Sequence, residues 1–247
     1  MAFENGIWRT YWWLEARIAP GVRYAQVDWE ELLFDIVQPG THWLDVGCGH
    51  TLFSEWRAAQ ETELLRRPTS IVGLDPEFGS LRAHRSISLR IAGDAQYLPF
   101  ANETFDLVTA NMVVEHLPKP EVQFREIARV LKPGGRFAFH TPNADGYPTR
   151  MAQMVPDGMR AIAARMLETR PSDDRFSTYY RANTATSIGS IAQDSGFMVE
   201  KLHLIRSTAM FWRIAPLAAV ELLFLRGLAK PEMARLRPNL IAVLRKQ

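Results

Sequence analysis

LDVGCG, residues 44–49, is an apolar run that ends in two glycines separated by one residue. Apolar residues before such a pair predict a buried strand that turns tightly into a helix. Glycine allows the turn and lets the backbone approach a ligand, and a helix start offers unpaired N–H groups. A dinucleotide loop of the G-x-G-x-x-G kind needs a third glycine near position 52, where Leu52 stands. The pattern therefore fits a plain strand-to-helix turn or a ligand-binding turn, and it disfavours a pyrophosphate loop.

Outward from this run, short apolar stretches alternate with helical patterns, which is typical of βαβ units around a parallel sheet. The expected strands are His42–Gly47, Ser70–Asp75, Ile87–Ala92, Phe105–Thr109, Arg136–His140, Phe197–Ile205 and Asn239–Arg245. The expected helices between them are Leu52–Arg66, Phe78–Arg85, Glu121–Leu131 and Thr184–Ser195. The sequence therefore predicts an α/β fold.

The flanks of this alternation follow other patterns. Two amino-terminal helices are expected, divided at Pro20-Gly21, and the first of them, which carries Trp8, Tyr11, Trp12 and Trp13, is expected to close over the ligand. A proline-divided insertion after the fifth strand contains a helix over Gly158–Leu167. One domain, residues 1–247, is expected. Its parts are a helical cap (1–40), a core (41–141), an insertion that covers the pocket (142–181) and a part that completes the sheet (182–247).

Composition and charge exclude several classes of protein. The chain has 247 residues, 47% of them apolar and 23% charged, which is enough for one full core. A net charge of +2 gives no bulk attraction to nucleic acid. The single cysteine, Cys48, makes no internal disulfide, and no Cys/His cluster has the spacing of metal ligands. We expect a cytoplasmic protein with no metal and no nucleic-acid partner.

Two later carboxylates indicate a nucleoside ligand. Asp75 ends the second expected strand, where it can accept the hydrogens of both ribose hydroxyls. Asp94 and Ala95 follow the third strand, where a carboxylate and an adjacent backbone N–H can bind an adenine edge. Each acid alone fits a solvated loop residue better, but their order along the chain favours the nucleoside.

Five blocks of this chain together resemble the class I S-adenosylmethionine-dependent methyltransferases, in the methyltransferase type 11 group related to ubiquinone and menaquinone biosynthesis methyltransferases. In chain order the blocks are LDVGCG, GLD, GDAQYLPF, FDLVTANMVVEHL and RVLKPGGRF, all between Trp43 and Thr141. The resemblance implies S-adenosylmethionine as cofactor. It also implies a Rossmann-like, seven-stranded, mostly parallel sheet with helices on both faces and an antiparallel last strand.

The resemblance further implies which residues bind the cofactor. The implied contacts are Asp45, Gly47, Cys48 and Gly49 for the methionine part, Asp75 and Pro76 for the ribose, Asp94 and Ala95 for the adenine, and Asn111 for the sulfonium end. One departure from the family pattern is Thr51, where a glycine is common, and it bears on where the next helix begins.

Methyl transfer is an in-line displacement at carbon, so the protein mainly aligns the reactants and needs no covalent catalyst. A hydroxyl nucleophile can need a general base, and His116 and His140 are the candidates near the carboxyl ends of strands. For each of them capping or packing is the alternative. Tyr179 and Tyr180, in the insertion, are candidates to contact the substrate, with aromatic packing as the alternative.

The sequence thus predicts an enzyme that methylates a small-molecule acceptor, which is a sugar, a lipid-linked compound or a quinone-like compound. One alternative is a nicotinamide-dependent oxidoreductase, against which Leu52 and the LKPGG block argue. The other is a non-catalytic protein that binds S-adenosylmethionine.

Charge is concentrated at the carboxyl-terminal side. Nine Lys/Arg and two Glu from Lys201 onward give +7, which leaves −5 for the first 200 residues. Residues 209–229 are apolar but too interrupted by charges for a transmembrane span. A helix here could make peripheral contact with an anionic membrane. Because its charges do not share one helical face, packing on the sheet edge or on a second subunit of a homodimer is favoured.

Overall fold

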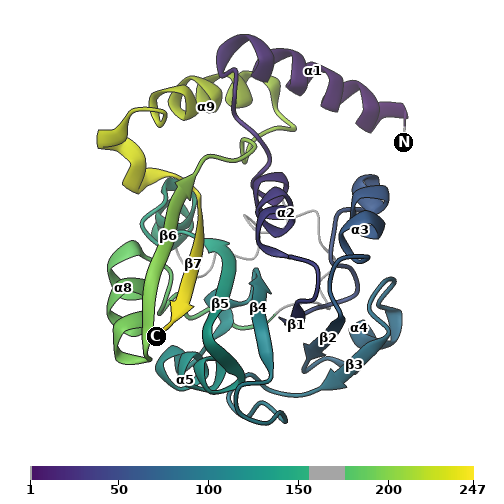
Figure 1. Ribbon diagram of the computed structural model, residues 1–247. Coiled ribbons are helices and arrows are strands. Elements are labelled where there is room, and N and C mark those ends of the chain that lie inside the picture. Colours follow the sequence, from purple (N-terminus) through teal and green to yellow (C-terminus); the bar gives the residue numbers. More distant parts are fainter. Residues whose placement is uncertain (1, 156–175) are drawn as a thin grey trace. The chain divides into compact units, whose positions relative to one another are not determined.

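The structure is a computed structural model that describes residues 2–155 and 176–247 (Figure 1). The chain divides into two compact units. The unit that we call the sheet unit comprises Asp28–Thr141, Ser177–His203 and Leu240–Gln247, and the helical unit comprises Met1–Val27, Pro142–Phe176 and Leu204–Asn239. The single-domain assignment and its internal boundaries stay predictions, and the helix expected at Gly158–Leu167 lies outside the described residues.

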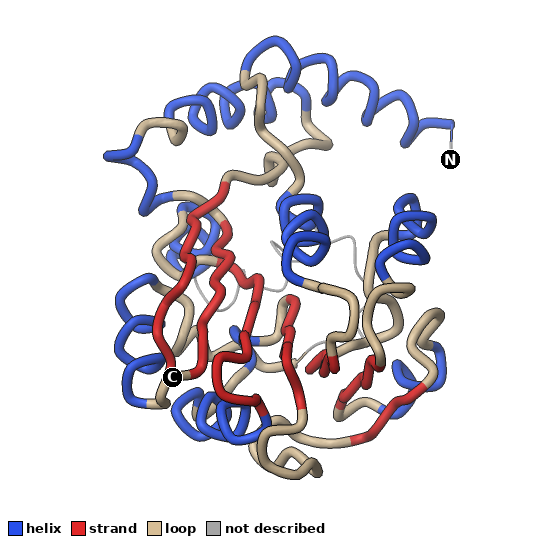
Figure 2. Tube along the Cα trace, viewed as in Figure 1, coloured by secondary structure: helices blue, strands red, loops and turns tan. Residues whose placement is uncertain are grey.

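Seven strands form one sheet in the order β3-β2-β1-β4-β5-β7-β6, drawn in red in Figure 2. They are β1 His42–Val46, β2 Ser70–Asp75, β3 Leu89–Ala92, β4 Phe105–Asn111, β5 Leu131–Pro142, β6 Phe197–Ile205 and β7 Asn239–Lys246. The pairings among β1 to β5 are parallel. β7 runs the other way, since Lys246 at its end donates to the carbonyl of Leu131 at the start of β5. The expected mostly parallel sheet is confirmed.

Helices lie on both faces of the sheet, as expected (Figure 1). Those that belong to the sheet unit are α3 Ala58–Leu64, α4 Phe78–Ala83, α5 Pro120–Val130 and α8 Ala185–Asp194, with most of α2 Ala25–Ile36. The helical unit contains α1 Ala2–Ile18, α6 Tyr147–Met154 and α9 Ala215–Gly227. Short 3-10 turns are Glu55–Arg57, Val114–His116 and Pro231–Leu236. Among the described helices, none combines the length and apolar character that crossing a bilayer requires.

The helix expected at Leu52–Arg66 begins later than the sequence indicated. Its first turn starts at Glu55, and it becomes α-helical only at Ala58. Thr51 Oγ1 donates to the carbonyl of Phe53 at 2.6 Å, and the N–H of Ser54 donates to a distant carboxylate at 3.0 Å. These two bonds hold the segment out of helical form. The glycine loop is therefore not followed directly by a helix terminus, contrary to the expectation.

β5 begins at Leu131, five residues earlier than expected, because the LKPGG block is a bulge inside the strand. Leu131 pairs with Phe105 and Arg136 pairs with Leu107, so three extra residues loop out on the β5 side. Gly134 in this loop adopts a φ of +74°, a conformation that favours glycine. The bulge ends where the buried part of β5 begins.

Other strand ends also differ from the expected ones. β1 ends at Val46 instead of Gly47, β5 at Pro142 instead of His140 and β7 at Lys246 instead of Arg245. β3 starts at Leu89 rather than Ile87, because the Ile87 N–H is used in a turn, where it donates to His84 Nδ1 at 3.1 Å. β4 continues beyond Thr109 to Asn111, which makes Asn111 the last residue of the strand.

Candidate functional site

The sheet order places the candidate site at one edge. β1 lies between β2 and β4, so the chain leaves β1 on one side for β2 and β3 and returns to its other side for β4. In open α/β sheets, ligands bind outside the carboxyl ends of the strands at such a reversal. The register sets Val46 level with Leu74 and Ala110. Of the cofactor contacts expected from sequence, Gly47, Asp75 and Asn111 follow directly after these residues.

The glycine loop after β1 depends on two glycines in different ways. Gly47 and Gly49 have φ values of +67° and +56°, which side chains rarely adopt. A Cβ on Gly47 would lie 2.3 Å from Val113 Cγ2, whereas a Cβ on Gly49 would meet no atom within 4 Å. Position 47 therefore needs glycine for both conformation and space, and position 49 for conformation.

The N–H groups of this loop are used within the protein. Those of Gly47 and Cys48 donate to the carbonyl of Leu74, at 2.7 and 3.2 Å. That of Gly49 donates to Asp75 Oδ2 at 2.9 Å. These amides hold the loop against β2 instead of facing the ligand, contrary to the expectation.

Cys48 packs beneath the loop. Its side chain is buried in a cluster with Leu81 and Ile87, and burial raises the pKa of its thiol. A protonated, buried thiol is chemically inert. Any contact of Cys48 with the cofactor is therefore through its backbone.

Asp75 ties the end of β2 to the glycine loop. It is buried, and its two oxygens accept the N–H groups of Gly49 and of Glu77, the latter at 2.8 Å. A carboxylate offers about four acceptor positions, which fits the expected role toward a ribose. Pro76, which follows it, is exposed. Contact of both residues with the ribose stays a prediction.

Asp45 is a buried acid near the carboxyl end of β1. Thr109 Oγ1 donates to its Oδ1 at 2.5 Å, and Thr109 in turn accepts a bond from Trp43 Nε1 at 2.6 Å. Burial raises the pKa of Asp45 to about 7, and the charge of Asp75 adds to this, although the bond from Thr109 acts in the opposite direction. A carboxyl that ionises near neutrality beside a second acid fits a cationic ligand group.

Asp94 and Ala95 follow β3 as expected. Asp94 is exposed and accepts the N–H of Gln96 at 2.8 Å, and Ala95 is buried. The sequence analysis missed two exposed aromatic rings shortly after the β2 and β3 strand ends, Phe78 at 65% and Tyr97 at 80% exposure. Such rings offer stacking faces to a planar base. The sequence signal that could have indicated these rings is a large aromatic residue three positions after each acid, Phe78 after Asp75 and Tyr97 after Asp94.

His140 and Asn111 come together at the ends of β5 and β4. His140 Nδ1 lies 2.9 Å from Asn111 Oδ1, and the ring of Trp29 stacks on the imidazole with 6.3 Å between centroids. An amide oxygen only accepts, so Nδ1 carries a hydrogen and Nε2 is the basic nitrogen of the neutral ring. Met112 beside them has a φ of +57°. Such strain is found at functional sites, and Trp29 was not expected here.

The second histidine candidate lies in a different arrangement. His116 Nδ1 is 3.0 Å from the carbonyl of Ser177. The N–H groups of Tyr179 and Tyr180 donate to the carbonyl of Glu115, at 2.7 and 3.2 Å. The structure thus brings His116, Tyr179 and Tyr180 together, and burial raises the pKa of Tyr180. Their catalytic and substrate roles stay predictions.

Glu115 is a buried acid that the sequence analysis did not single out. Thr141 Oγ1 donates to Glu115 Oε2 at 2.7 Å, and Asn183 Nδ2 donates to Thr141 Oγ1 at 2.6 Å. This chain of bonds joins the segment after β4 to the end of β5 and to the residue before the capping Thr184 of α8. The only local signal for it was an acid within an otherwise apolar stretch, VVEHL.

Comparisons with known proteins agree with this geometry. The family model described as Methyltransferase domain matches residues 44–139. The demethylmenaquinone methyltransferase of Corynebacterium urealyticum is 30% identical over 169 residues, which are 61% of this chain and 70% of that protein. The protein of the same name from Corynebacterium kroppenstedtii is 36% identical over 131 residues, which are 51% of this chain and 54% of that protein.

A solved structure supports the fold. The S-adenosylmethionine-dependent methyltransferase from Mesorhizobium loti superposes with a TM-score of 0.56 at 18% identity, over 90% of this chain and 98% of that one. The buried acids Asp45 and Asp75 fit a ligand with a cationic amino acid and a ribose. The chain belongs to the class I S-adenosylmethionine-dependent methyltransferases, in the type 11 group, and S-adenosylmethionine is its cofactor.

Proposed function

We propose that this methyltransferase transfers the methyl group to a ring carbon of a lipid-linked, quinol-like acceptor. The observation that carries the proposal is the name shared by the two Corynebacterium relatives, demethylmenaquinone methyltransferase. The first of them is matched over 70% of its length and the second over 54%. Of the acceptors expected from sequence, the lipid-linked and quinone-like classes are therefore favoured over a sugar.

The proposed reaction needs a base. S-adenosylmethionine supplies the methyl group on a sulfonium, which leaves as the thioether when the new bond forms. A ring carbon of a quinol becomes nucleophilic when the adjacent hydroxyl loses its proton. After the methyl group is added, that carbon loses its own hydrogen as a proton to water, which restores the aromatic ring, and the protonated base returns its proton to the ring oxygen. We assign the first proton to His140 Nε2, because the bond to Asn111 fixes the tautomer of His140 with its hydrogen on Nδ1.

The acceptor is tested by turnover. Purified protein is mixed with S-adenosylmethionine and a short-chain naphthoquinol kept reduced, its oxidised quinone, or a sugar, and S-adenosylhomocysteine and the methylated product are measured by mass spectrometry. We expect product only from the reduced quinol. Turnover with the sugar alone would contradict the proposal. Tight cofactor binding with no turnover on any acceptor would favour the non-catalytic alternative.

Replacing His140 with alanine is expected to lower kcat for the quinol about 100-fold, because a general base contributes on that order. Binding of S-adenosylhomocysteine, measured by calorimetry, should change little. His116→Ala is the matched control, since His116 bonds to a backbone carbonyl, and its kcat should stay within about threefold of the parent. A larger loss in His116→Ala than in His140→Ala would reverse the assignment.

A further inference from the structure

The helical unit contains a packed pair of helices, α1 and α9, which lie side by side (Figures 1 and 2). Their shared core is apolar and fully buried. Its members are Tyr11, Ala19, Val22, Ala209, Ala218, Leu222, Leu225 and Leu228. α9 therefore uses one of its faces on α1, and its opposite face points away from α1.

Glu221, the acidic residue of α9, does not lie on the exposed face of the helix. Glu221 is 6% exposed and accepts the N–H groups of Met210 and Phe211, both at 2.8 Å. The hydroxyl of Tyr147 donates to the same carboxylate. From the sequence alone, Glu221 is expected to be one of the surface charges that prevent an amphipathic helix over residues 209–229. The structure corrects this, because the carboxylate is bonded inside the unit.

The outer face of α9 is consequently apolar and exposed. Leu217, Val220, Leu223 and Phe224 are 46%, 66%, 59% and 37% exposed. At about 100° per residue these four side chains fall within about 120° of the helix circumference. Arg226 lies outside that arc, about 60° beyond Leu223 and 180° from Leu217. The face thus carries an uninterrupted apolar strip.

The turn before α9 adds an aromatic residue and a cation next to this face. The guanidinium of Arg213 lies 4.9 Å from the centroid of the Trp212 ring in that turn. Tryptophan with arginine is the combination that favours the boundary between lipid headgroups and acyl chains.

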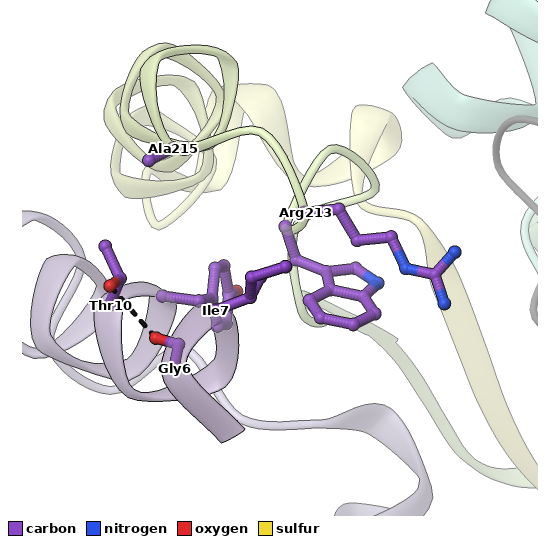
Figure 3. Close-up of a pocket in the computed structure, with 7 residues that line it drawn as sticks. Gly6, Ile7, Thr10, Arg213 and Ala215 are labelled. Carbon is purple, nitrogen blue, oxygen red and sulfur yellow. Dashed lines mark hydrogen bonds between the residues drawn. The ribbon is translucent and has the colours of Figure 1, made fainter. Parts of the chain in front are cut away.

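A hollow of about 440 Å³ opens between α1 and the turn before α9 (Figure 3). It is lined only by residues of the helical unit. They are Gly6, Ile7, Thr10, Tyr11, Trp212, Arg213 and Ala215. Its lining is mostly apolar and aromatic, and the Arg213 side chain extends away from the other labelled residues (Figure 3), so the hollow suits an acyl chain.

The charge of the helical unit identifies the occupant of this surface. Its described residues include ten Lys/Arg and five Asp/Glu, a formal charge of +5. A second copy would bring the same positive charge against it, whereas an anionic bilayer is complementary. We propose that the outer face of α9, together with the turn before it, docks peripherally on an anionic lipid bilayer. This goes beyond the proposed acceptor and does not depend on it.

The proposal is tested by flotation of the full chain with vesicles. One set contains phosphatidylcholine alone, and the other contains equal parts of phosphatidylcholine and phosphatidylglycerol. We expect the protein to float with the anionic vesicles only, and added salt to release part of it. The double variant Val220→Glu/Leu223→Glu should lose at least about tenfold in partitioning. Because both residues are exposed, its thermal unfolding should match that of the parent.

Met198→Glu is the matched control, since Met198 is 52% exposed on β6 in the sheet unit, and it should float as the parent does. Failure to float with either vesicle, or flotation that the double variant keeps, would overturn the proposal. A dimer in light scattering that the double variant loses would assign the surface to a second copy instead. Turnover of a short-chain naphthoquinol in solution reports separately on the acceptor.

Discussion

Replacing Gly47 with alanine is expected to lower affinity for S-adenosylhomocysteine by at least about 100-fold. The added Cβ would lie 2.3 Å from Val113 Cγ2, and valine has little rotamer freedom with which to move away. The φ of +67° adds strain of about 1 kcal/mol for a residue with a side chain. The loop would have to shift, and a displacement near 1 Å in a binding loop costs on this order. Isothermal titration calorimetry measures the loss.

Gly49→Ala is the matched control for this prediction. Its Cβ meets no atom within 4 Å, so only the strain from a φ of +56° applies. Affinity should fall by no more than about tenfold, which corresponds to about 1.4 kcal/mol. Equal losses in the two variants would show that the contact with Val113 is not what makes Gly47 necessary.

Replacing Asp45 with asparagine is expected to stabilise the free protein at pH 8 by on the order of 3 kcal/mol. The pKa of Asp45 is about 7 in the folded protein, well above that of an unfolded aspartate. Between about pH 4 and 7 the unfolded chain loses this proton first, so stability falls as the pH rises and is level above 7. Asparagine keeps an oxygen for Thr109 but carries no charge.

Urea unfolding at pH 5, 6, 7 and 8 measures this difference. The parent should lose stability over that range, and Asp45→Asn should lose less. Asp94→Asn is the control, because Asp94 is exposed and its neutralisation should leave the pH dependence of the parent unchanged. A parallel pH dependence in Asp45→Asn and the parent would place the titration elsewhere.

The same carboxyl is expected to make cofactor binding depend on pH. A bound cation favours the ionised form of Asp45, so affinity for S-adenosylmethionine should rise up to about pH 7 and then level. Asp45→Asn should bind more weakly at pH 8 and lose this rise. The gain in stability and the loss of affinity would then have one cause, the burial of a charge that the ligand neutralises.

Local sequence patterns predicted where the strands lie along the chain and that helices alternate with them. The apolar run before Gly47 is recognisable because a buried parallel strand needs continuous apolar residues. The acid that ends β2 is recognisable because it directly follows such a run. The family blocks added the cofactor. Apolar patterns and family motifs each depend on residues that are close together in the sequence. The strand ends that they predict agree with the structure to within a few residues in most cases.

What local patterns missed depends on residues distant in sequence. The late start of the helix after the glycine loop involves Glu30, which accepts the N–H of Ser54. The hydrogen bonds of the glycine-loop N–H groups depend on the position of β2 beside β1, since the carbonyl of Leu74 in β2 accepts two of them. The apolar outer face of α9 became visible only when Glu221 was found bonded to Tyr147. Long-range bonds of this kind leave no periodic trace in the sequence.

The sheet order has a consequence for biosynthesis. β6 is one of the two edge strands, and β7, which comes after every other described strand, lies between β5 and β6. A nascent chain on the ribosome must therefore hold β6 without its partner until β7 has been made. Unpaired strands are aggregation hazards, and charges such as Glu200 and Lys201 on β6 discourage pairing with the wrong chain during this wait.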